Sequence, residues 1–204
     1  MHCAPCRCDY PEWLRSCPAC GAALEPSPPI DTAQGPQVGY AELVERVVAA
    51  GGSLSIELST TAVGIEQTWR FFYRGFGCAW AERMSGRRED LAVELKAVEV
   101  GRHRRSFLLH YIGYGFAWTK QLDGVISGNP AHLEARKVEM DRKTRFPYLG
   151  YGFAWTQEMG GTCGDRLELA LVTTEVVRKQ RYGFPYQGYG FAWARGAQLT
   201  IQSR

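Results

Sequence analysis

The phrase Gly-Tyr-Gly-Phe-Ala-Trp at residues 113–118 recurs along the chain. It returns at 150–155 and 188–193, and in the variant Gly-Phe-Gly-Cys-Ala-Trp at 75–80. The tryptophans of these phrases lie about 38 residues apart, and a fixed period of this length is typical of repeat proteins. One structural unit is therefore repeated four times, and most of the chain is scaffold.

Each repeat has two halves, and both halves have the pattern of a β-strand. The first half alternates apolar and polar residues, as in Leu91, Val93 and Leu95, and the same alternation occurs at 54–58 and 167–171. The second half is aromatic and contains glycine, and its β-branched and aromatic content favours strand. A turn joins the halves, so the repeats predict four hairpins and about eight strands.

The bulky side chains change sides midway along these strands. In residues 146–155 they move from the face of Tyr148 to that of Phe153 and Trp155, and in the first half they move from Leu95 to Val98. Such a strand is usually bulged or sharply coiled. We therefore predict a mainly β fold, in which four hairpin repeats of ~38 residues form an antiparallel barrel or sandwich with the aromatic residues in its core.

Residues 198–201 look like the first strand of an unfinished fifth repeat. They could pair with residues 54–58 and so close the edge of the sheet, which would otherwise be prone to aggregation.

The remaining segments predict three parts: a metal-binding ribbon at 1–24, a linker at 25–38, and a helix with the four-repeat β domain at 39–204. The linker is rich in proline and reads as a semi-stiff tether between two independent units. Tyr40, Leu43, Val44, Val47 and Val48 follow the spacing of one helical face. This amphipathic helix is expected to lie across the sheet or to plug one end of it, and the alternative is a helix that binds a partner.

Two Cys-x-x-Cys pairs lie close to the amino terminus. Structural zinc sites take four such ligands, and two tight turns supply them here, with Tyr10 and Trp13 as apolar cover. The segment 3–21 resembles the short zinc ribbons at the start of many bacterial proteins, and the resemblance implies a structural zinc ion (Zn2+) and no activity. The expected ligands are Cys3, Cys6, Cys17 and Cys20.

Other interpretations of this segment stay open. Cys8 and His2 are spare ligands, so the choice among Cys3, Cys6 and Cys8 is not decided by the spacing. A redox dithiol, thiols without metal, and bound iron are the alternatives to zinc.

The inner turns of three repeats are rich in basic residues. Because the hairpins are homologous, these turns are expected at one end of the sheet, where they would form a basic rim suited to phosphate backbones or acidic surfaces. The opposite loops are expected to be longer and to carry Asp90, Asp123 and Asp165. Alternatively, the repeats only preserve the charge of an ancestral solvated turn. The predicted anion-binding residues are Arg102, Arg104, Arg105, Arg142, Lys143, Arg145, Arg178, Lys179 and Arg181.

Composition and motifs reduce the number of functional classes to which the chain could belong. The net charge is only +3, and no run approaches the ~18 apolar residues of a membrane helix. No leader pattern is visible, so we expect the reducing cytoplasm, where clustered cysteines hold metal more often than disulfides. The histidines are scattered, and the Gly-Tyr-Gly-Phe phrase lies within strands, so we expect no enzyme.

The sequence therefore predicts a non-catalytic, zinc-containing binding or adaptor protein. Its basic rim would bind an anionic partner, either nucleic acid or an acidic protein surface. Two alternatives remain: a barrel that binds a small apolar ligand, and a repeat module that self-associates through an incompletely sealed edge.

Overall fold

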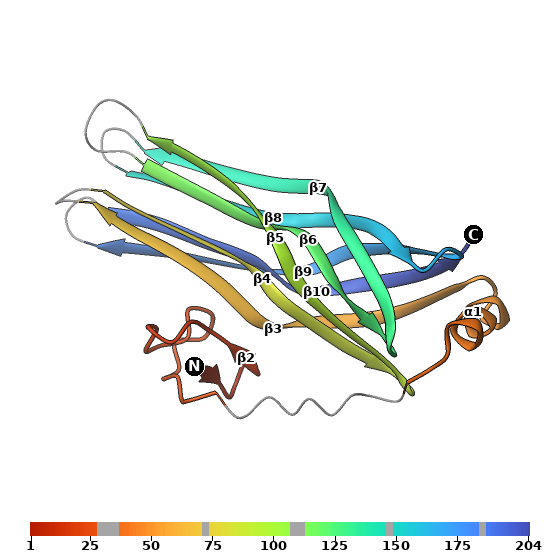
Figure 1. Cartoon of the computed structure of the whole chain (residues 1–204). Coiled ribbons are helices and arrows are strands. Elements are labelled where there is room, and N and C mark those ends of the chain that lie inside the picture. Colours follow the sequence, from red (N-terminus) through yellow and green to blue (C-terminus); the bar gives the residue numbers. More distant parts are fainter. Residues whose placement is uncertain (28–36, 71–73, 107–112, 146–148, 184–186) are drawn as a thin grey trace.

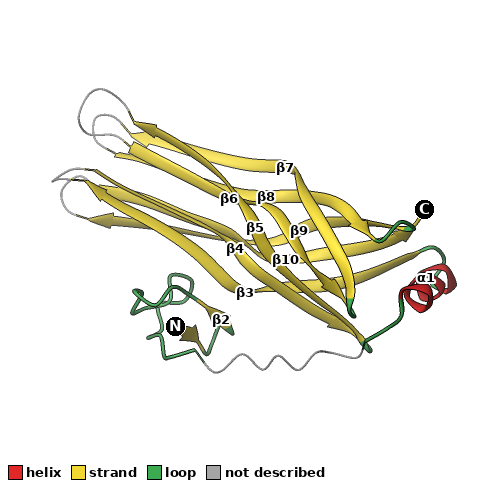
Figure 2. Ribbon diagram, viewed as in Figure 1, coloured by secondary structure: helices red, strands yellow, loops and turns green. Residues whose placement is uncertain are grey.

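The computed structural model describes residues 1–27, 37–70, 74–106, 113–145, 149–183 and 187–204, and most of them form a β-barrel (Figures 1 and 2). One helix, α1 (Tyr40–Ala49), and two short strands, β1 (His2–Cys3) and β2 (Cys8–Asp9), occur in these ranges beside the barrel strands. The barrel strands are β3 (Ser53–Arg70), β4 (Arg74–Arg88), β5 (Leu91–Ser106), β6 (Gly113–Ile126), β7 (Asn129–Arg145), β8 (Leu149–Cys163), β9 (Leu167–Gly183) and β10 (Gln187–Ser203).

The barrel closes because each strand pairs with the next in the chain and β10 pairs with β3. All these pairings are antiparallel. The predicted antiparallel barrel of about eight strands is thus confirmed. Residues 198–201 do pair with the start of β3, with Leu199 opposite Ile56, but they are the end of β10 rather than the beginning of a fifth repeat.

Closure covers only part of the barrel length. Within a hairpin the ladder is long: β5 and β6 pair from Val93–Ile126 to Ser106–Gly113. Between hairpins it is short: β4 and β5 pair only over 83–88 and 91–96. We call the part of the barrel in which neighbouring hairpins are joined by ladders the closed half. The part in which they are not joined is the split half, and the boundary between the two is the waist. In Figure 1 the hairpins of the split half, its two-stranded arms, extend to the left in an upper group (β5–β8) and a lower group (β3, β4, β9 and β10).

β-Bulges mark the waist in every hairpin. The register shifts around residues 61, 98, 136 and 195. Each extra residue reverses the side to which the following residues point, which explains the midway switch seen in the sequence. Leu95 is buried before the bulge of β5, and the inserted Val98 is exposed. The predicted bulges are thus confirmed.

Four threonine hydroxyls join neighbouring hairpins at the waist, where the ladders between hairpins end. All four threonines are buried. Buried carbonyl groups need donors, and the hydroxyls provide them in place of backbone N–H groups. The bonds run from Thr60 Oγ1 to Ala194 O (2.6 Å), from Thr119 Oγ1 to Ala81 O (2.7 Å), from Thr156 Oγ1 to Thr119 O, and from Thr173 Oγ1 to Thr156 O (2.6 Å).

The recurrent phrase explains how the hairpins pack in the split half. Alternate residues of a strand point to opposite faces, so the phrase places glycine and alanine on one face and large aromatic residues on the other. A Cβ on Gly152 of β8 would overlap the ring of Phe116 in β6, and one on Gly190 of β10 would lie 2.8 Å from the Phe153 ring. The aromatic face of one hairpin thus packs against the small-residue face of the next.

These aromatic residues form the core of the described split half. Phe116, Phe153, Trp155 and Trp193 are buried, and Trp80 and Trp118 are partly buried against the core clusters. At these positions the interpretation of the aromatic stripe as packing holds. Phe116, Phe153 and Trp155 make small clusters with alanines of neighbouring hairpins, separate from the aliphatic core of the closed half. Trp193 belongs to a larger cluster that includes residues of the amino-terminal ribbon.

Helix α1 plugs the end of the closed half. Leu43, Val44 and Val47 are buried in the aliphatic core, whereas Val48, expected on the same face, is 55% exposed. The hydroxyl of Tyr40 accepts a hydrogen bond from Arg166 N (2.8 Å) and donates one to Cys163 O (3.2 Å). The expectation of a helix at one end of the barrel is thus confirmed.

The loops at this end differ from the expected long, Gly-rich connections. β4 and β5 are joined by Glu89 and Asp90, and β6 and β7 by Ser127 and Gly128. The strands simply extend further than the sequence pattern indicated, so Asp123 lies within β6.

Removing one waist hydroxyl should destabilise the barrel. Thr173→Val keeps the side-chain shape but leaves Thr156 O without its donor, so we expect the free energy of unfolding to fall by about 1–3 kcal/mol. The exposed neighbour offers a matched control, and Thr174→Val should change stability by less than about 0.5 kcal/mol. Urea denaturation measures both, and equal effects would contradict a role for the buried hydroxyl.

Enlarging the small-residue face should also destabilise the barrel. Gly152→Ala forces a methyl group into the Phe116 ring, and overpacking of this kind costs about 1–3 kcal/mol. At Gly39 a Cβ would have no neighbour within 4 Å, so Gly39→Ala adds no overlap, and the loss of stability should be limited to the poorer capping of α1 by alanine. Thermal unfolding of the two variants compares them, and an unchanged midpoint for Gly152→Ala would argue against close packing of the hairpins.

Candidate metal centre and basic strand ends

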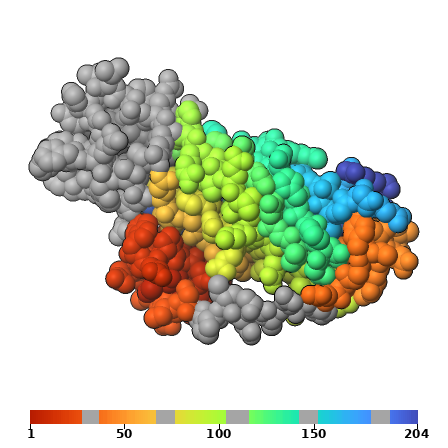
Figure 3. Space-filling model, in the orientation of Figure 1, coloured from red at the N-terminus to blue at the C-terminus, as the bar shows by residue number. Residues whose placement is uncertain are grey.

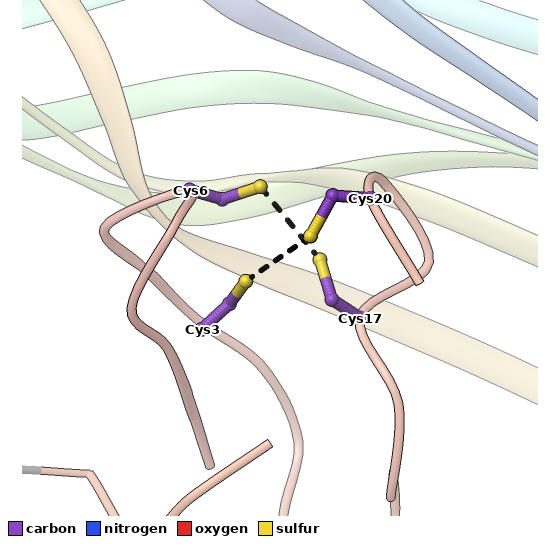
Figure 4. Close-up of side chains that lie close together, drawn as sticks. All are labelled: Cys3, Cys6, Cys17 and Cys20. Atoms are coloured by element: carbon purple, nitrogen blue, oxygen red, sulfur yellow. Dashed lines mark hydrogen bonds between the residues drawn. The ribbon is translucent and has the colours of Figure 1, made fainter. Parts of the chain in front are cut away.

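Cys3, Cys6, Cys17 and Cys20 form a four-sulfur cluster that could hold a metal ion (Figure 4). Their sulfur atoms all lie within 4.8 Å of one another. Cys3 Sγ is 3.5 Å from Cys20 Sγ, and Cys17 Sγ is 3.8 Å from Cys6 Sγ. Four sulfurs placed tetrahedrally about 2.3 Å from a zinc ion would be about 3.8 Å apart, so the donor set fits a tetrahedral metal.

Two tight turns bring the sulfurs together. In the first, Arg7 N donates to Ala4 O (3.3 Å), and in the second Gly21 N donates to Cys17 O (2.8 Å). Gly21 has a φ of 81°, in the left-handed region that glycine adopts without strain. The pairing of β1 with β2 then sets Cys3 opposite Cys8.

The protein environment treats the four thiols differently. Burial raises the pKa of Cys3 to about 11 and raises the pKa of Cys6 further. Burial also acts to raise the pKa of Cys17, but its hydrogen bond with the Tyr10 hydroxyl, 3.5 Å away, and those from backbone N–H groups bring the pKa down to about 7. A cation at the centre would favour the thiolate form of all four.

Cys8 and His2, the spare ligands, do not join this group. The Cys8 thiol is buried and donates to Asp9 O at 3.7 Å. His2 Nδ1 lies 2.9 Å from the carboxylate of Asp9. Trp13 is 50% exposed, so of the two aromatic residues expected as cover only Tyr10 is buried.

The ribbon packs against the barrel, at the seam between the hairpin β9–β10 and the hairpin β3–β4. Tyr10 lies edge-on to Trp193, with ring centroids 6.3 Å apart. Asp9 pairs in parallel with Ala62 of β3, and its carboxylate lies 3.6 Å from Arg83 Nη2. Figure 3 shows the ribbon in red against the gold segment of β3. The two parts thus share an apolar interface that the sequence had not indicated.

The predicted basic residues lie in strands rather than in turns. Their backbones belong to the ends of β5, β7 and β9 in the split half, because these strands continue further than expected. The register makes Arg105, Lys143 and Arg181 equivalent, each opposite the tyrosine of its phrase. The side chains that lie outside the described part of the structure are those of Arg104, Arg105, Arg142, Lys143, Arg145 and Arg181.

Two of the basic residues with described side chains link neighbouring hairpins. The guanidinium of Arg102 in β5 lies 5.5 Å from the ring centroid of Trp80 in β4, and its Nε donates to Glu66 (3.1 Å). The guanidinium of Arg178 in β9 lies 4.4 Å from the ring of Trp155 in β8. Such cation–π contacts between hairpins left no signal in the sequence. Lys179 is exposed beside Arg178.

A small cavity lies at the waist, lined by Trp80, Trp118, Trp155 and Trp193 together with the waist threonines Thr119, Thr156 and Thr173. Its volume is about 10 Å³. That is about the space of a single water molecule, so this cavity cannot take a small apolar ligand.

A polar cluster lies on the outside of the closed half. His132 Nδ1 is 2.6 Å from Asp123 Oδ1, and His132 Nε2 is 3.6 Å from Glu134. The carboxylate of Asp123 raises the pKa of His132, and the imidazole lowers the pKa of Asp123. These side chains are about half exposed or more, so their mutual attraction contributes little to stability.

Metal content distinguishes the four clustered cysteines from Cys8. We expect the purified protein to carry one metal ion per chain, Cys17→Ser to lose it, and Cys8→Ala to keep it, because the Cys8 thiol lies outside the cluster. Plasma mass spectrometry of the three proteins measures this. Loss of the ion from Cys8→Ala with retention in Cys17→Ser would contradict the assignment.

Comparison with known proteins adds no relative. No protein-family model, no curated protein and no solved structure matches the chain. In the described ranges, no helix has the length and apolar character needed to cross a membrane. A function for the chain must therefore be inferred from its own residues.

Proposed function

We propose that this protein is a non-catalytic binding or adaptor protein, in which the basic ends of β5, β7 and β9 bind an anionic partner. The observation that carries the proposal is the repetition of a basic residue at one register position, in Arg105, Lys143 and Arg181. These strands run in the same direction around the barrel, so their basic ends lie at the same end of the molecule (Figure 1).

Clustered cations of this kind attract polyanions through the summed field of their charges. Phosphate backbones are the commonest such partners, and nucleic acid is the one to test first. Binding would neutralise the backbone without reading the base sequence.

The ribbon supports this proposal through a structural zinc ion. Four cysteine sulfurs in a closed, tetrahedral arrangement are the usual ligands of structural zinc, and they leave no open position for a substrate. The expected reducing cytoplasm would keep the four thiols available for the metal. By packing on the seam beside Trp193, the ribbon would hold the hairpins β9–β10 and β3–β4 together.

The two other candidate functions have less support. The waist cavity is about 10 Å³, which disfavours a ligand-binding barrel. The ladder between β10 and β3 occupies the edge through which the closed half could otherwise have self-associated.

Salt dependence tests the proposal. Binding of a double-stranded DNA fragment should weaken as the salt concentration rises. The slope of log K against log salt should become flatter by about 2–3 in the triple variant Arg105→Gln, Lys143→Gln, Arg181→Gln, because each cation removed contributes about 0.9 to the slope. Fluorescence anisotropy with labelled DNA over a salt series measures the slope.

The matched control removes three cations from the closed half, by Arg87→Gln, Lys96→Gln and Arg166→Gln, and should leave the slope unchanged. The same titrations with polyglutamate ask whether a non-nucleic polyanion is bound as well. Absence of binding to either polyanion, or an equal loss of slope in both triple variants, would refute the proposal.

A further inference from the structure

We propose that the outer edges of β5 and β9 in the split half bind an acidic, extended peptide of a partner protein by strand addition. This inference rests on the proposed function and names the chemistry of the anionic partner. In strand addition, main-chain hydrogen bonds supply affinity and the side chains of the edge supply selectivity.

The first observation is that both strands continue far beyond their ladders with the preceding hairpin. The ladder between β4 and β5 ends at Arg83–Lys96, whereas β5 continues to Ser106. The ladder between β8 and β9 ends at Glu158–Val172, whereas β9 continues to Gly183. Among the described pairings, the outer backbone edges of these extensions take no strand.

The exposure of side chains on β5 and β9 agrees with a position of these strand extensions at the periphery of the split half. Arg102 and His103 are neighbours on opposite faces of β5, and both are exposed; Arg178 and Lys179 in β9 are also both exposed. In a strand buried on one side, one of two neighbours would be covered.

The second observation is that the protein already fills the equivalent edge of β3. At the waist, Asp9 of β2 pairs in parallel with Ala62, and its carboxylate contacts Arg83. The added segment is short, extended and acidic at the point of pairing. The ribbon thus shows, on one hairpin, the kind of segment that this edge accepts.

The charges of the edge residues favour β5 and β9 over β7 as the site for an acidic peptide. The register makes Arg102 and Arg178 equivalent to Met140, and His103 and Lys179 equivalent to Asp141. β7 therefore carries an acidic residue where β9 has a cation. Stacking on Trp155 holds Arg178 in place, so an acidic strand would meet a cation already ordered at the edge of β9. Arg102 stacks likewise on Trp80, and there an acidic strand would share the guanidinium with Glu66.

The experiment uses a labelled eight-residue peptide of alternating aspartate and valine, with the full-length protein. Fluorescence anisotropy should show binding, and N-methylation of alternate peptide nitrogens should weaken it by about tenfold or more, because the main-chain donors are lost. A lysine–valine peptide of the same length should not bind.

A charge reversal tests the position of the site. Lys179→Glu should weaken binding of the acidic peptide by about fivefold or more, and Arg87→Glu, the same change in the closed half, should leave it unaltered. Equal unfolding midpoints of the two variants would show that both are folded, and the N-methylated peptide tests strand addition on the unaltered protein if Lys179→Glu does not fold.

The outcomes separate this inference from the proposed function. If the N-methylated peptide binds as tightly as its parent, or if only DNA binds, strand addition is refuted and polyanion binding stands. If neither the acidic peptide nor any polyanion binds, both fail. Binding of the acidic peptide that is lost on N-methylation and weakened by Lys179→Glu supports the inference.

Discussion

The hydrogen-bonded ladders between neighbouring hairpins end at the waist, and the other features of the barrel follow from this. A β-barrel whose neighbouring hairpins separate exposes backbone carbonyls to the interior, where an unpaired polar group costs free energy. In each repeat a threonine hydroxyl supplies a donor for such a carbonyl of the neighbouring hairpin. Two positions at the waist are involved, and each repeat has a threonine at one of them and an alanine at the other. The first strand of the hairpin carries the threonine in the first and fourth repeats, where Thr60 and Thr173 occur with Ala81 and Ala194 of the second strand. In the second and third repeats the second strand carries it, as Thr119 and Thr156, and the first strand has Ala97 and Ala135 at the positions equivalent to Thr60.

Separation of the hairpins is what makes the glycine-aromatic phrase necessary. Two-stranded sheets are marginal in water on their own, so each arm must bury its faces against its neighbours. A face of glycine and alanine receives the rings of the preceding hairpin, as at Gly152 and Phe116. The same split leaves the outer strands β5, β7 and β9 with an open edge, and basic side chains on an open edge discourage pairing between copies of a protein. The charges that we assign to binding therefore also suit a strand that must stay soluble.

The ribbon covers the seam between the hairpins β9–β10 and β3–β4, and this seam differs from the other three seams between neighbouring hairpins. At the register position of Ala62, the other hairpins have Glu99, Lys137 and Glu175, and each of these residues forms an exposed ion pair. A small apolar residue there leaves room for β2, and Arg83 pairs with Asp9 of the ribbon instead. Four similar units thus form an asymmetric molecule in which one seam is covered by a metal-binding module.

The sequence alone predicted four hairpins, the strand character of their halves, the bulges and two Cys-x-x-Cys pairs as metal ligands. These features are local, because period-two alternation, its change of phase and the Cys-x-x-Cys spacing are each carried by a few neighbouring residues. Only the tertiary structure decided that the basic residues lie on strand edges, that Arg102 and Arg178 stack on tryptophans of other hairpins, and that Tyr10 docks the ribbon against Trp193. These contacts depend on where the ladders between hairpins end. Packing between segments far apart in the chain sets that point, so no single segment shows it as a periodic pattern.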